Sequence, residues 1–286
     1  MSRWLVTGAT GMLGRDMCLA LQRHGEPVTA LGHRELDITD AAAVAGRVRD
    51  HGPDVVVNCA AWTAVDAAEQ QEARALAVNG AGAANLAAAC ARQGARLVQV
   101  STDYVFGGDQ PRGYAEEDRP APLNAYGRTK LAGERAALGL PGAGYVVRTA
   151  WLYGAHGPNF VAAMIAKARA GSPVRVVDDQ RGQPTWSMDV AARIVALIGA
   201  GAPPGVYHAT STGDTTWHGL AREVFRLAGA DPGLVEPVPS AAYPRPAARP
   251  RCSVLRHGGW ARAGLAPIGA WDSALAQAMP VLLAGR

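Results

Sequence analysis

Two residues whose types and spacing could do chemistry are Tyr126 and Lys130, in the stretch NAYGRTKLAGE. Small and apolar residues surround them, as on a helix that packs along one face. Residues four apart on a helix lie on the same face, so the two side chains could meet. A cation beside a phenol makes the phenol a better proton donor or base near neutral pH. The pattern indicates either an acid–base pair or two surface residues of an amphipathic helix.

A glycine-rich loop near the N-terminus is the second chemical signal. The stretch VTGATGMLGRDM places Gly8, Gly11 and Gly14 directly after an apolar run and at the start of a helical segment. Glycines permit a tight turn and let backbone N–H groups approach a pyrophosphate, and a helix N-terminus adds further donors. This spacing after a strand favours a dinucleotide site over a purely structural turn.

The segment ALGHRELDITD follows the second apolar run and bears on the choice of dinucleotide. A carboxylate at the strand end would hold the ribose of NAD, but His33 and Arg34 come first. Arg34 could pair with a 2′-phosphate, so we expect NADPH, with NADH possible. Asp37 and Ile38 could flank the adenine, and Asp40 is a candidate N-cap for the next helix.

These residues require an ordered scaffold, and the first half of the chain predicts one. Short apolar runs predict strands at 3–7, 27–31, 54–58, 96–101 and 145–149. Longer alanine-rich segments predict helices near 12–24, 40–50, 68–93 and 124–138. Fully apolar strands between helices are typical of a buried parallel sheet. We therefore predict an α/β fold, a Rossmann-like doubly wound parallel sheet with helices on both faces.

After about residue 150 the alternation loosens, which predicts a smaller second lobe. We expect a short strand and polar loop over 173–185, a helix over 189–200, a strand over 205–210, and helices near 216–228 and 270–283. The Pro/Arg-rich stretch 237–255 is either a linker or an ordered loop. We assign 1–150, with about 182–205, to the nucleotide domain, and 151–286 to an interleaved C-terminal lobe.

Composition excludes several other classes of protein. Of 286 residues, 49% are hydrophobic and 18% charged, as in a soluble globular chain. The net charge of +4 is scattered without a basic run, so we expect no nucleic-acid partner. The four cysteines show no CxxC spacing, which argues against zinc and disulfides and favours cytosolic thiols. No apolar stretch has the length of a membrane span, and no signal peptide is apparent.

The glycine loop and the Tyr126/Lys130 pair together resemble the extended short-chain dehydrogenase/reductases. Further stretches narrow the resemblance to the dTDP-4-dehydrorhamnose reductase family: LDITD, NCAAWTAVDAAE, STDYVF, AYGRTKLAGE, RTAWLYG, DQRGQPT and ARPRCSVL. They occur in order over nearly the whole chain. The resemblance implies a cytoplasmic enzyme that uses NAD(P)H to reduce the 4-keto group of a dTDP-6-deoxy sugar, dTDP-4-dehydro-L-rhamnose. The later segments would then form the nucleotide-sugar lobe.

The resemblance also implies roles for individual residues. Tyr126 would deliver the proton, Lys130 would supply charge and grip the nicotinamide ribose, and Thr102 would bond the keto oxygen. The implied cofactor contacts are Gly8, Thr10, Gly11, Met12, Leu13, Arg34, Asp37, Ile38, Ala60, Ala61 and Thr63, besides Tyr126 and Lys130. The implied substrate contacts are Thr102, Asp103, Tyr104, Trp151, Asn159, Gln183 and Arg249. Arg245 and Arg251 are alternatives to Arg249 for the diphosphate, and Asn79 could fix the geometry beside the cofactor.

The sequence leaves open the assembly state, the identity of the sugar and the alternative of a regulatory role. Some family members dimerise around magnesium held by glutamates, but the aligned positions here are Arg15–Asp16 and Met188–Asp189, so we expect no metal and a monomer or weak homodimer. The sugar could be another NDP-4-keto-6-deoxysugar of secondary metabolism. A non-catalytic NADP-binding regulatory subunit is a further alternative, against which the intact Tyr126, Lys130 and Thr102 argue.

Overall fold

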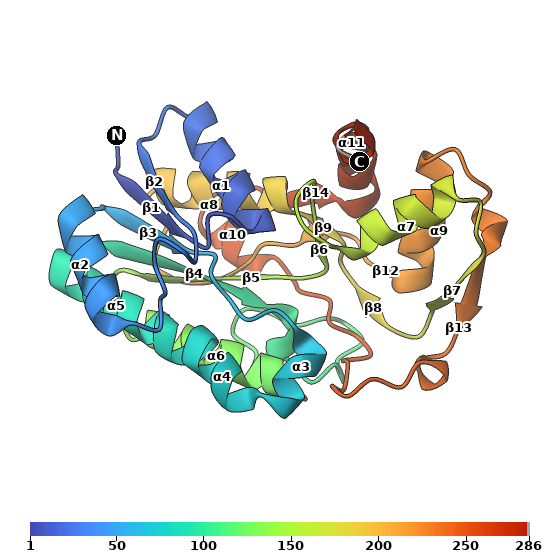
Figure 1. The fold of residues 1–286 in the computed structure, drawn as a ribbon, viewed down its shortest axis with the longest axis horizontal. Coiled ribbons are helices and arrows are strands. Elements are labelled where there is room, and N and C mark those ends of the chain that lie inside the picture. Colours follow the sequence, from blue (N-terminus) through green and yellow to red (C-terminus); the bar gives the residue numbers. More distant parts are fainter. Residues whose placement is uncertain (285–286) are drawn as a thin grey trace.

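The fold centres on a six-stranded, fully parallel sheet. The structure is a computed structural model, which describes residues 1–284. The strand order is β10-β5-β4-β3-β1-β2. The strands are β1 (Trp4–Thr7), β2 (Val28–Leu31), β3 (Val55–Asn58), β4 (Arg96–Thr102), β5 (Gly144–Thr149) and β10 (Gly205–His208). The predicted α/β doubly wound sheet is confirmed (Figure 1).

Helices cover both faces of this sheet because successive strand residues point to opposite sides. Val6 and Val57 pack with α1 (Met12–Arg23) and α8 (Ser187–Gly199) on one face. Leu5 and Val56 pack on the other face with α2 (Ala41–His51), α5 (Ala83–Gln93) and α6 (Ala125–Leu138), as Figure 1 shows. Each fully buried Val or Leu side chain contributes roughly 1.5–3 kcal/mol, so these layers hold the sheet rigid.

The segment predicted as one helix over 68–93 is instead divided. It forms α3 (Val65–Gln70), α4 (Glu72–Leu76), a π-helical turn over Ala77–Gly82, and α5. The π turn brings its backbone against α6, where a Cβ on Gly133 would overlap the carbonyl oxygen of Asn79. The single-helix prediction was wrong because local propensity does not report this close approach of two helices.

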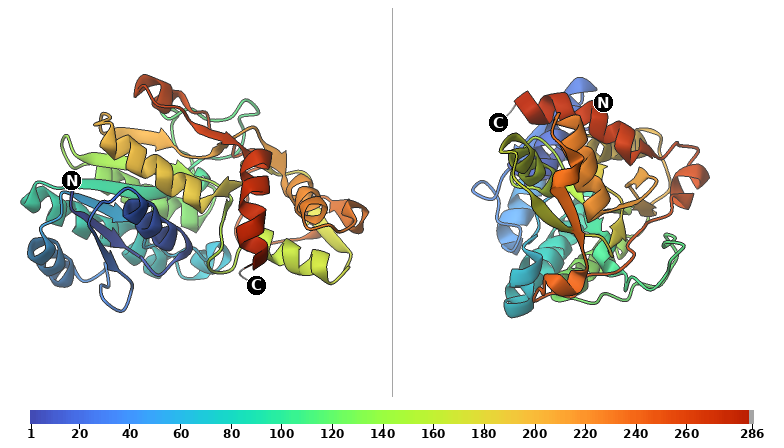
Figure 2. Two further views of the ribbon diagram at one scale, coloured as in Figure 1. Left: turned by 90° about the horizontal axis from the view of Figure 1, so that it is seen from above. Right: turned by 90° about the vertical axis from the view of Figure 1, so that its right-hand side faces the viewer.

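The second lobe has a core of its own. Its helices are α7 (Phe160–Arg169), α9 (Trp217–Leu227) and α11 (Trp271–Ala284), and β7 (Val174–Val177) pairs in parallel with β13 (Val235–Val238). Ile165, Phe225 and Leu275 are among its fully buried residues. Figures 1 and 2 place α11 at the junction between the sheet and this lobe. None of the helices in residues 1–284 is long and apolar enough to cross a membrane.

Short elements link the two parts. They are β6 (Leu152–Tyr153), β8 (Arg181–Gly182), β9 (Thr185–Trp186), β11 (Ser211–Thr212), β12 (Thr215–Thr216), α10 (Gly258–Arg262) and β14 (Ile268–Ala270). The Pro/Arg-rich stretch is an ordered loop: Cys252 bridges Arg181, and Leu255 bridges Tyr114. The linker alternative was therefore wrong. Because α8 and β10 follow residue 150 yet complete the sheet layer, the chain passes between the two parts more than once.

Candidate active site

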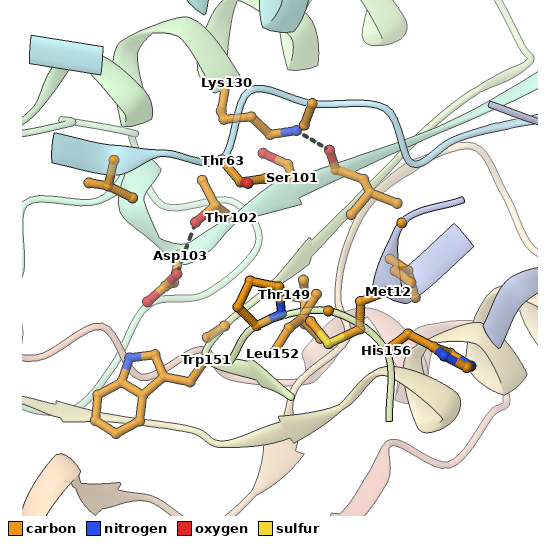
Figure 3. Close-up of a pocket in the computed structure, with 18 of the residues that line it drawn as sticks. Met12, Thr63, Ser101, Thr102, Asp103, Lys130, Thr149, Trp151, Leu152 and His156 are labelled. Carbon is orange, nitrogen blue, oxygen red and sulfur yellow. Dashed lines mark hydrogen bonds between the residues drawn. The ribbon is translucent and has the colours of Figure 1, made fainter. Parts of the chain in front are cut away.

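A cavity of about 920 Å³ opens at the carboxyl ends of the central strands, where doubly wound sheets bind ligands (Figure 3). Segments that follow β1, β3 and β5, together with the end of β4, line it. The residues predicted from sequence that line it are Thr10, Gly11, Met12, Leu13, Ala61, Thr63, Thr102, Asp103, Tyr126, Lys130 and Trp151. The strands thus bring both halves of the predicted constellation, the glycine loop and the Tyr–Lys pair, to one space.

The glycine loop has a geometry that other residues would disrupt. Gly8 has φ of +64°, and a Cβ there would lie 2.6 Å from the backbone nitrogen of Ala60. The N–H of Gly11 donates to the carbonyl oxygen of Gly8 at 3.0 Å, which closes the turn. Gly11 is also the N-cap of α1 and supplies no side-chain acceptor to the first helical N–H groups. Those N–H groups and the helix dipole fit the pyrophosphate of a dinucleotide.

Tyr126 lies half-buried in the first turn of α6, and its ring packs edge-on against Tyr104 with ring centres 5.9 Å apart. Burial raises the pKa of Tyr126 well above its usual value, and the Asp103 charge raises this pKa further. A hydrogen bond with Thr102 lowers the same pKa by less. Lys130 is not among the groups that shift this pKa, so its expected effect on the phenol stays a prediction. A phenol that keeps its proton is suited to act as an acid.

Lys130 is fully buried one turn further along α6. Its Nζ donates a 2.6 Å hydrogen bond to the carbonyl oxygen of Val100 on β4. Burial lowers the pKa of Lys130 to about 8, while the charge of Glu134 opposes this effect. The amine is thus mostly protonated at neutral pH and is fixed between α6 and β4.

Thr102 ends β4, Asp103 follows it, and both line the same cavity. The Thr102 hydroxyl donates to Oδ1 of Asp103 at 3.0 Å and accepts from the backbone N–H of Tyr104 at 3.1 Å. Burial raises the pKa of Asp103 to about 6. A hydrogen bond with the Ser253 side chain lowers the same pKa by less. The carboxyl group lines the cavity beside the Thr102 hydroxyl, where it can bond a polar ligand.

A polar scaffold holds these groups from behind. Oδ1 of Asn79 accepts from the backbone N–H of Trp62 at 2.9 Å, and its Nδ2 donates to Trp62 O and to Thr129 Oγ1, both at 3.1 Å. This confirms that Asn79 fixes the loop beside the cavity. Arg148 donates to both oxygens of Glu134, at 2.9 and 2.8 Å, and is a buried structural arginine.

Several predicted contacts lie outside this cavity because their side chains are used elsewhere. Gln183 is buried; its Oε1 accepts from Leu255 N at 2.7 Å, and its Nε2 donates to Ser211 O at 2.9 Å. Asn159 caps α7 and donates to the carbonyl oxygen of Gly154, so it shapes the cavity loop without lining it. Ala60 and Gly8 support the glycine loop through their backbones.

The predicted adenosine contacts are also away from the cavity. Asp37 is exposed, and its Oδ1 accepts from Thr39 N at 2.9 Å. Ile38 is buried against Gly82. Arg34 is exposed just after β2. The Glu35 carboxylate also lies near the end of this strand, since a Cβ added to Gly32 would be 2.7 Å from Oε2 of Glu35. The prediction that no carboxylate stands at the end of this strand was wrong, because Glu35 folds back over the turn.

A second pocket of about 470 Å³ adjoins the cavity, since Trp217 lines both. Tyr104 and Arg249, predicted as substrate contacts, line this pocket together with Arg175 and Arg245. Arg249 NH1 donates to Oδ1 of Asp66 at 2.5 Å. The pocket is therefore cationic with apolar walls, because Arg175 and Arg245 add positive charge to that of Arg249.

Sequence reasoning missed part of the cavity wall. Arg15, Val65, Val100, Ser101, Thr149, Ala150, Leu152, Ala155, His156, Gly157, Pro158 and Trp217 also line it. The rule that ligands meet the carboxyl ends of parallel strands could have found Ser101 and Thr149. Within residues 1–284, no group of three or more His, Cys, Asp or Glu side chains could hold a metal ion.

Comparison with known proteins agrees with this geometry. A family model described as the RmlD substrate binding domain matches residues 2–283. The chain belongs to the RmlD family. It is 57% identical over 291 residues to the dTDP-4-dehydrorhamnose reductase of Streptomyces griseus, covering 99% of this chain and 96% of that protein.

The chain is also similar to two other reductases. The dTDP-4-keto-6-deoxy-D-glucose reductase of Streptomyces niveus is 54% identical over 281 residues, covering 98% of this chain and 97% of that protein. The crystal structure of dTDP-4-dehydrorhamnose reductase from Bacillus anthracis in complex with NADP superposes with a TM-score of 0.94 and 36% identity, covering 98% and 99% of the two chains. The family resemblance predicted from the sequence is confirmed.

Proposed function

We propose that this chain is an NADPH-dependent dTDP-4-dehydrorhamnose reductase, which reduces the 4-keto group of dTDP-4-dehydro-L-rhamnose to give dTDP-L-rhamnose. The observation that carries the proposal is the cavity in which Tyr126, Lys130 and Thr102 meet the glycine loop. Identity of 57% to a reductase of that name supports the same substrate. The intact acid–base residues argue against a non-catalytic subunit.

The residues present fit the dinucleotide. The Gly8 turn leaves no room for a side chain, and the uncapped start of α1 offers N–H donors to a pyrophosphate. Lys130 lines the same cavity, where its ammonium can bond ribose hydroxyls. When bound, NADPH supplies the hydride that reduces the keto carbon.

The chain's own residues manage the charge and the proton. Negative charge grows on the 4-oxygen during reduction, and donors aimed at that atom stabilise it. The Tyr126 phenol, whose raised pKa keeps it protonated, donates its proton to this oxygen. The Thr102 hydroxyl donates a hydrogen bond to the same oxygen after turning from Asp103, its present acceptor. Lys130 carries the charge that offsets the phenolate left behind.

The adjoining pocket accommodates the nucleotide part of the substrate. Its arginines suit a diphosphate, since guanidinium groups bond phosphate oxygens in a fork. Arg249 is already paired with Asp66, so we assign the diphosphate contacts first to Arg175 and Arg245. The sugar would then lie beside Trp151, where an aromatic face meets ring C–H groups.

The test is a direct assay. Purified protein is mixed with dTDP-4-dehydro-L-rhamnose and NADPH, and nicotinamide absorbance is followed with Tyr126→Phe as the control. We expect turnover with the wild type and retained NADPH binding with a large fall in kcat for the variant. No absorbance loss with a folded, NADPH-binding wild type would reject the substrate.

A second substrate follows from the Streptomyces niveus relative, a dTDP-4-keto-6-deoxy-D-glucose reductase of 54% identity. The two keto sugars differ in configuration around the ring, so the same catalytic residues could serve either. Comparing kcat/KM on both sugars, without any epimerase present, distinguishes them. A higher kcat/KM on dTDP-4-keto-6-deoxy-D-glucose would replace our first assignment.

We further propose that the enzyme works in the cytoplasm as a monomer or weak homodimer. The four unpaired cysteines suit a reducing compartment. Sedimentation at micromolar concentration, with and without magnesium, measures the assembly state. A stable dimer that chelation of magnesium dissociates would contradict this part.

A further inference from the structure

The strained residue Trp151 lies at the boundary of the two pockets. It has φ of +47°, the one positive φ outside glycine in residues 1–284. This left-handed conformation strains a bulky residue, because its Cβ comes too close to the following carbonyl oxygen. Backbone strain of this kind persists only where the surrounding structure determines it, and it clusters at functional sites. The contacts of the Trp151 indole show which residues hold this strained conformation in place.

Two residues confine the indole of Trp151. One face lies flat on Trp217, with ring centres 3.6 Å apart and an interplanar angle of 7°. On another side Gly182 lies so close that a Cβ would overlap the indole at Cε2, Cζ2 and Nε1. Phe160 then packs on Trp217, with ring centres 4.7 Å apart. The aromatic stack therefore runs from the sugar end of the cavity into the second lobe.

Trp217 is the part of this stack that reaches both ligand spaces. It lines the 920 Å³ cavity beside Trp151, and it lines the 470 Å³ pocket beside Phe160 and Arg245. It also begins α9, whose N-cap Thr216 accepts a 3.0 Å hydrogen bond from Gly219 N. A ligand that fills the smaller pocket must contact the ring that supports Trp151.

We propose that Trp217 is a positioning residue, which acts through Trp151 and transmits occupancy of the nucleoside-diphosphate pocket to the wall of the sugar site. Binding of the nucleotide part fixes Trp217, and Trp217 fixes the indole against which the keto sugar is aligned. Remote binding energy is used in this way to orient the reacting group. The inference rests on the proposed function for the identity of the sugar, but not for the coupling itself.

Stacked indoles give an exciton couplet in circular dichroism, which reports the pair without turnover. We expect a couplet in the wild type, its loss in Trp217→Leu, and a change in the wild-type couplet when dTDP alone is added. Trp271→Phe is the matched control, because Trp271 is half-buried and lines neither pocket. In this variant the couplet of Trp151 and Trp217, and its response to dTDP, should equal those of the wild type. A couplet that bound dTDP leaves unchanged would overturn the coupling, whatever the sugar substrate is.

Kinetics separate positioning from packing. Trp217→Leu should lower kcat/KM for the dTDP-keto sugar about tenfold or more, since small misplacements in a site are costly. Trp217→Phe, which keeps a ring on Trp151, should recover most of this loss, and NADPH affinity should stay within about twofold of the wild type. Wild-type kcat/KM in Trp217→Leu, with the couplet absent, would show that the stack is only packing.

Gly182→Ala is a second, independent variant that changes the Trp151 side of the stack. It still tests the proposal if Trp217→Leu does not fold. The added methyl displaces the indole of Trp151 without touching the smaller pocket. We expect a lower kcat with dTDP affinity within about twofold of the wild type. An altered couplet with unchanged kcat, or an unaltered couplet, would overturn the proposal.

Discussion

Lys130 Nζ donates a 2.6 Å hydrogen bond to the carbonyl oxygen of Val100, which ties the helix of the Tyr–Lys pair to the central strand β4. The two residues come from elements that are not adjacent in the sequence, and their contact faces the cavity that both line. The bond fixes the ammonium, while burial lowers the pKa of Lys130 to about 8. The charge of the site is therefore sensitive to pH just above neutrality.

The pH dependence of turnover reports the charge of Lys130. A buried lysine with a pKa of about 8 is charged below that pH and loses its charge as pH rises through it. We expect kcat/KM to be level near pH 7 and to fall through about pH 8, because kcat/KM follows the free enzyme's ionisations. Lys130→Arg, whose guanidinium stays charged, should lack this fall. The same fall in the arginine variant would assign it to another group.

The buried pair of Glu134 and Arg148 yields a stability prediction. The two side chains are 1% and 3% exposed and bond through two contacts. Glu134→Ala leaves a buried guanidinium unpaired, so we expect a loss of about 3–5 kcal/mol in the free energy of unfolding by urea. Glu72→Ala breaks the exposed pair with Arg128 and should cost less than about 1 kcal/mol. Equal losses would contradict the role given to burial.

Two glycines with similar backbone angles provide a matched test of the phosphate loop. Gly8 has φ of +64° and Gly25 has φ of +70°. A Cβ at Gly8 would meet the Ala60 backbone at 2.6 Å, whereas a Cβ at Gly25 would meet nothing within 4 Å. Gly8→Ala should weaken NADPH binding more than about tenfold, while Gly25→Ala should cost only the strain of about 1 kcal/mol in stability. Calorimetric titration with NADPH measures both variants, and equal affinities would remove the loop from the cofactor site.

Arg34 and Glu35 at the end of β2 yield a prediction on cofactor choice. Arg34 is exposed and able to pair with a 2′-phosphate, while Glu35 lies over Gly32 beside Thr10. We expect Arg34→Ala to weaken NADPH about tenfold and to leave NADH within about twofold. Glu35→Gln should shift the preference the other way, because a carboxylate repels a phosphate. A ratio of the two affinities unchanged by Arg34→Ala would refute the NADP preference.

The sequence alone predicted the central sheet well because buried parallel strands have an unambiguous apolar pattern. The strand expected over 54–58 is observed as Val55–Asn58, and that over 3–7 as Trp4–Thr7. The helix Phe160–Arg169 was not predicted, and the helix expected over 68–93 is broken at Gln71 and contains a π turn over Ala77–Gly82. Its π turn depends on contact with α6, which a local pattern does not contain.

The sequence likewise predicted some residues of the candidate site and missed others. Tyr126, Lys130 and Thr102 were found because their types and spacing carry chemistry, and all three line the cavity. Gln183 was expected at the substrate, but its buried amide bonds the backbone at Leu255 and Ser211. Trp217 was missed because its role arises from stacking on a residue distant in sequence.

The central claim is that Tyr126 hands its proton to the sugar carbonyl, and single-turnover reduction of dTDP-4-dehydro-L-rhamnose by the NADPH-loaded protein tests it most directly. With Tyr126→Phe we predict a rate lower by about 10²–10⁴, the usual contribution of a positioned acid, with NADPH affinity and fold retained. A phenylalanine variant that reduces the sugar at the wild-type rate would contradict the account.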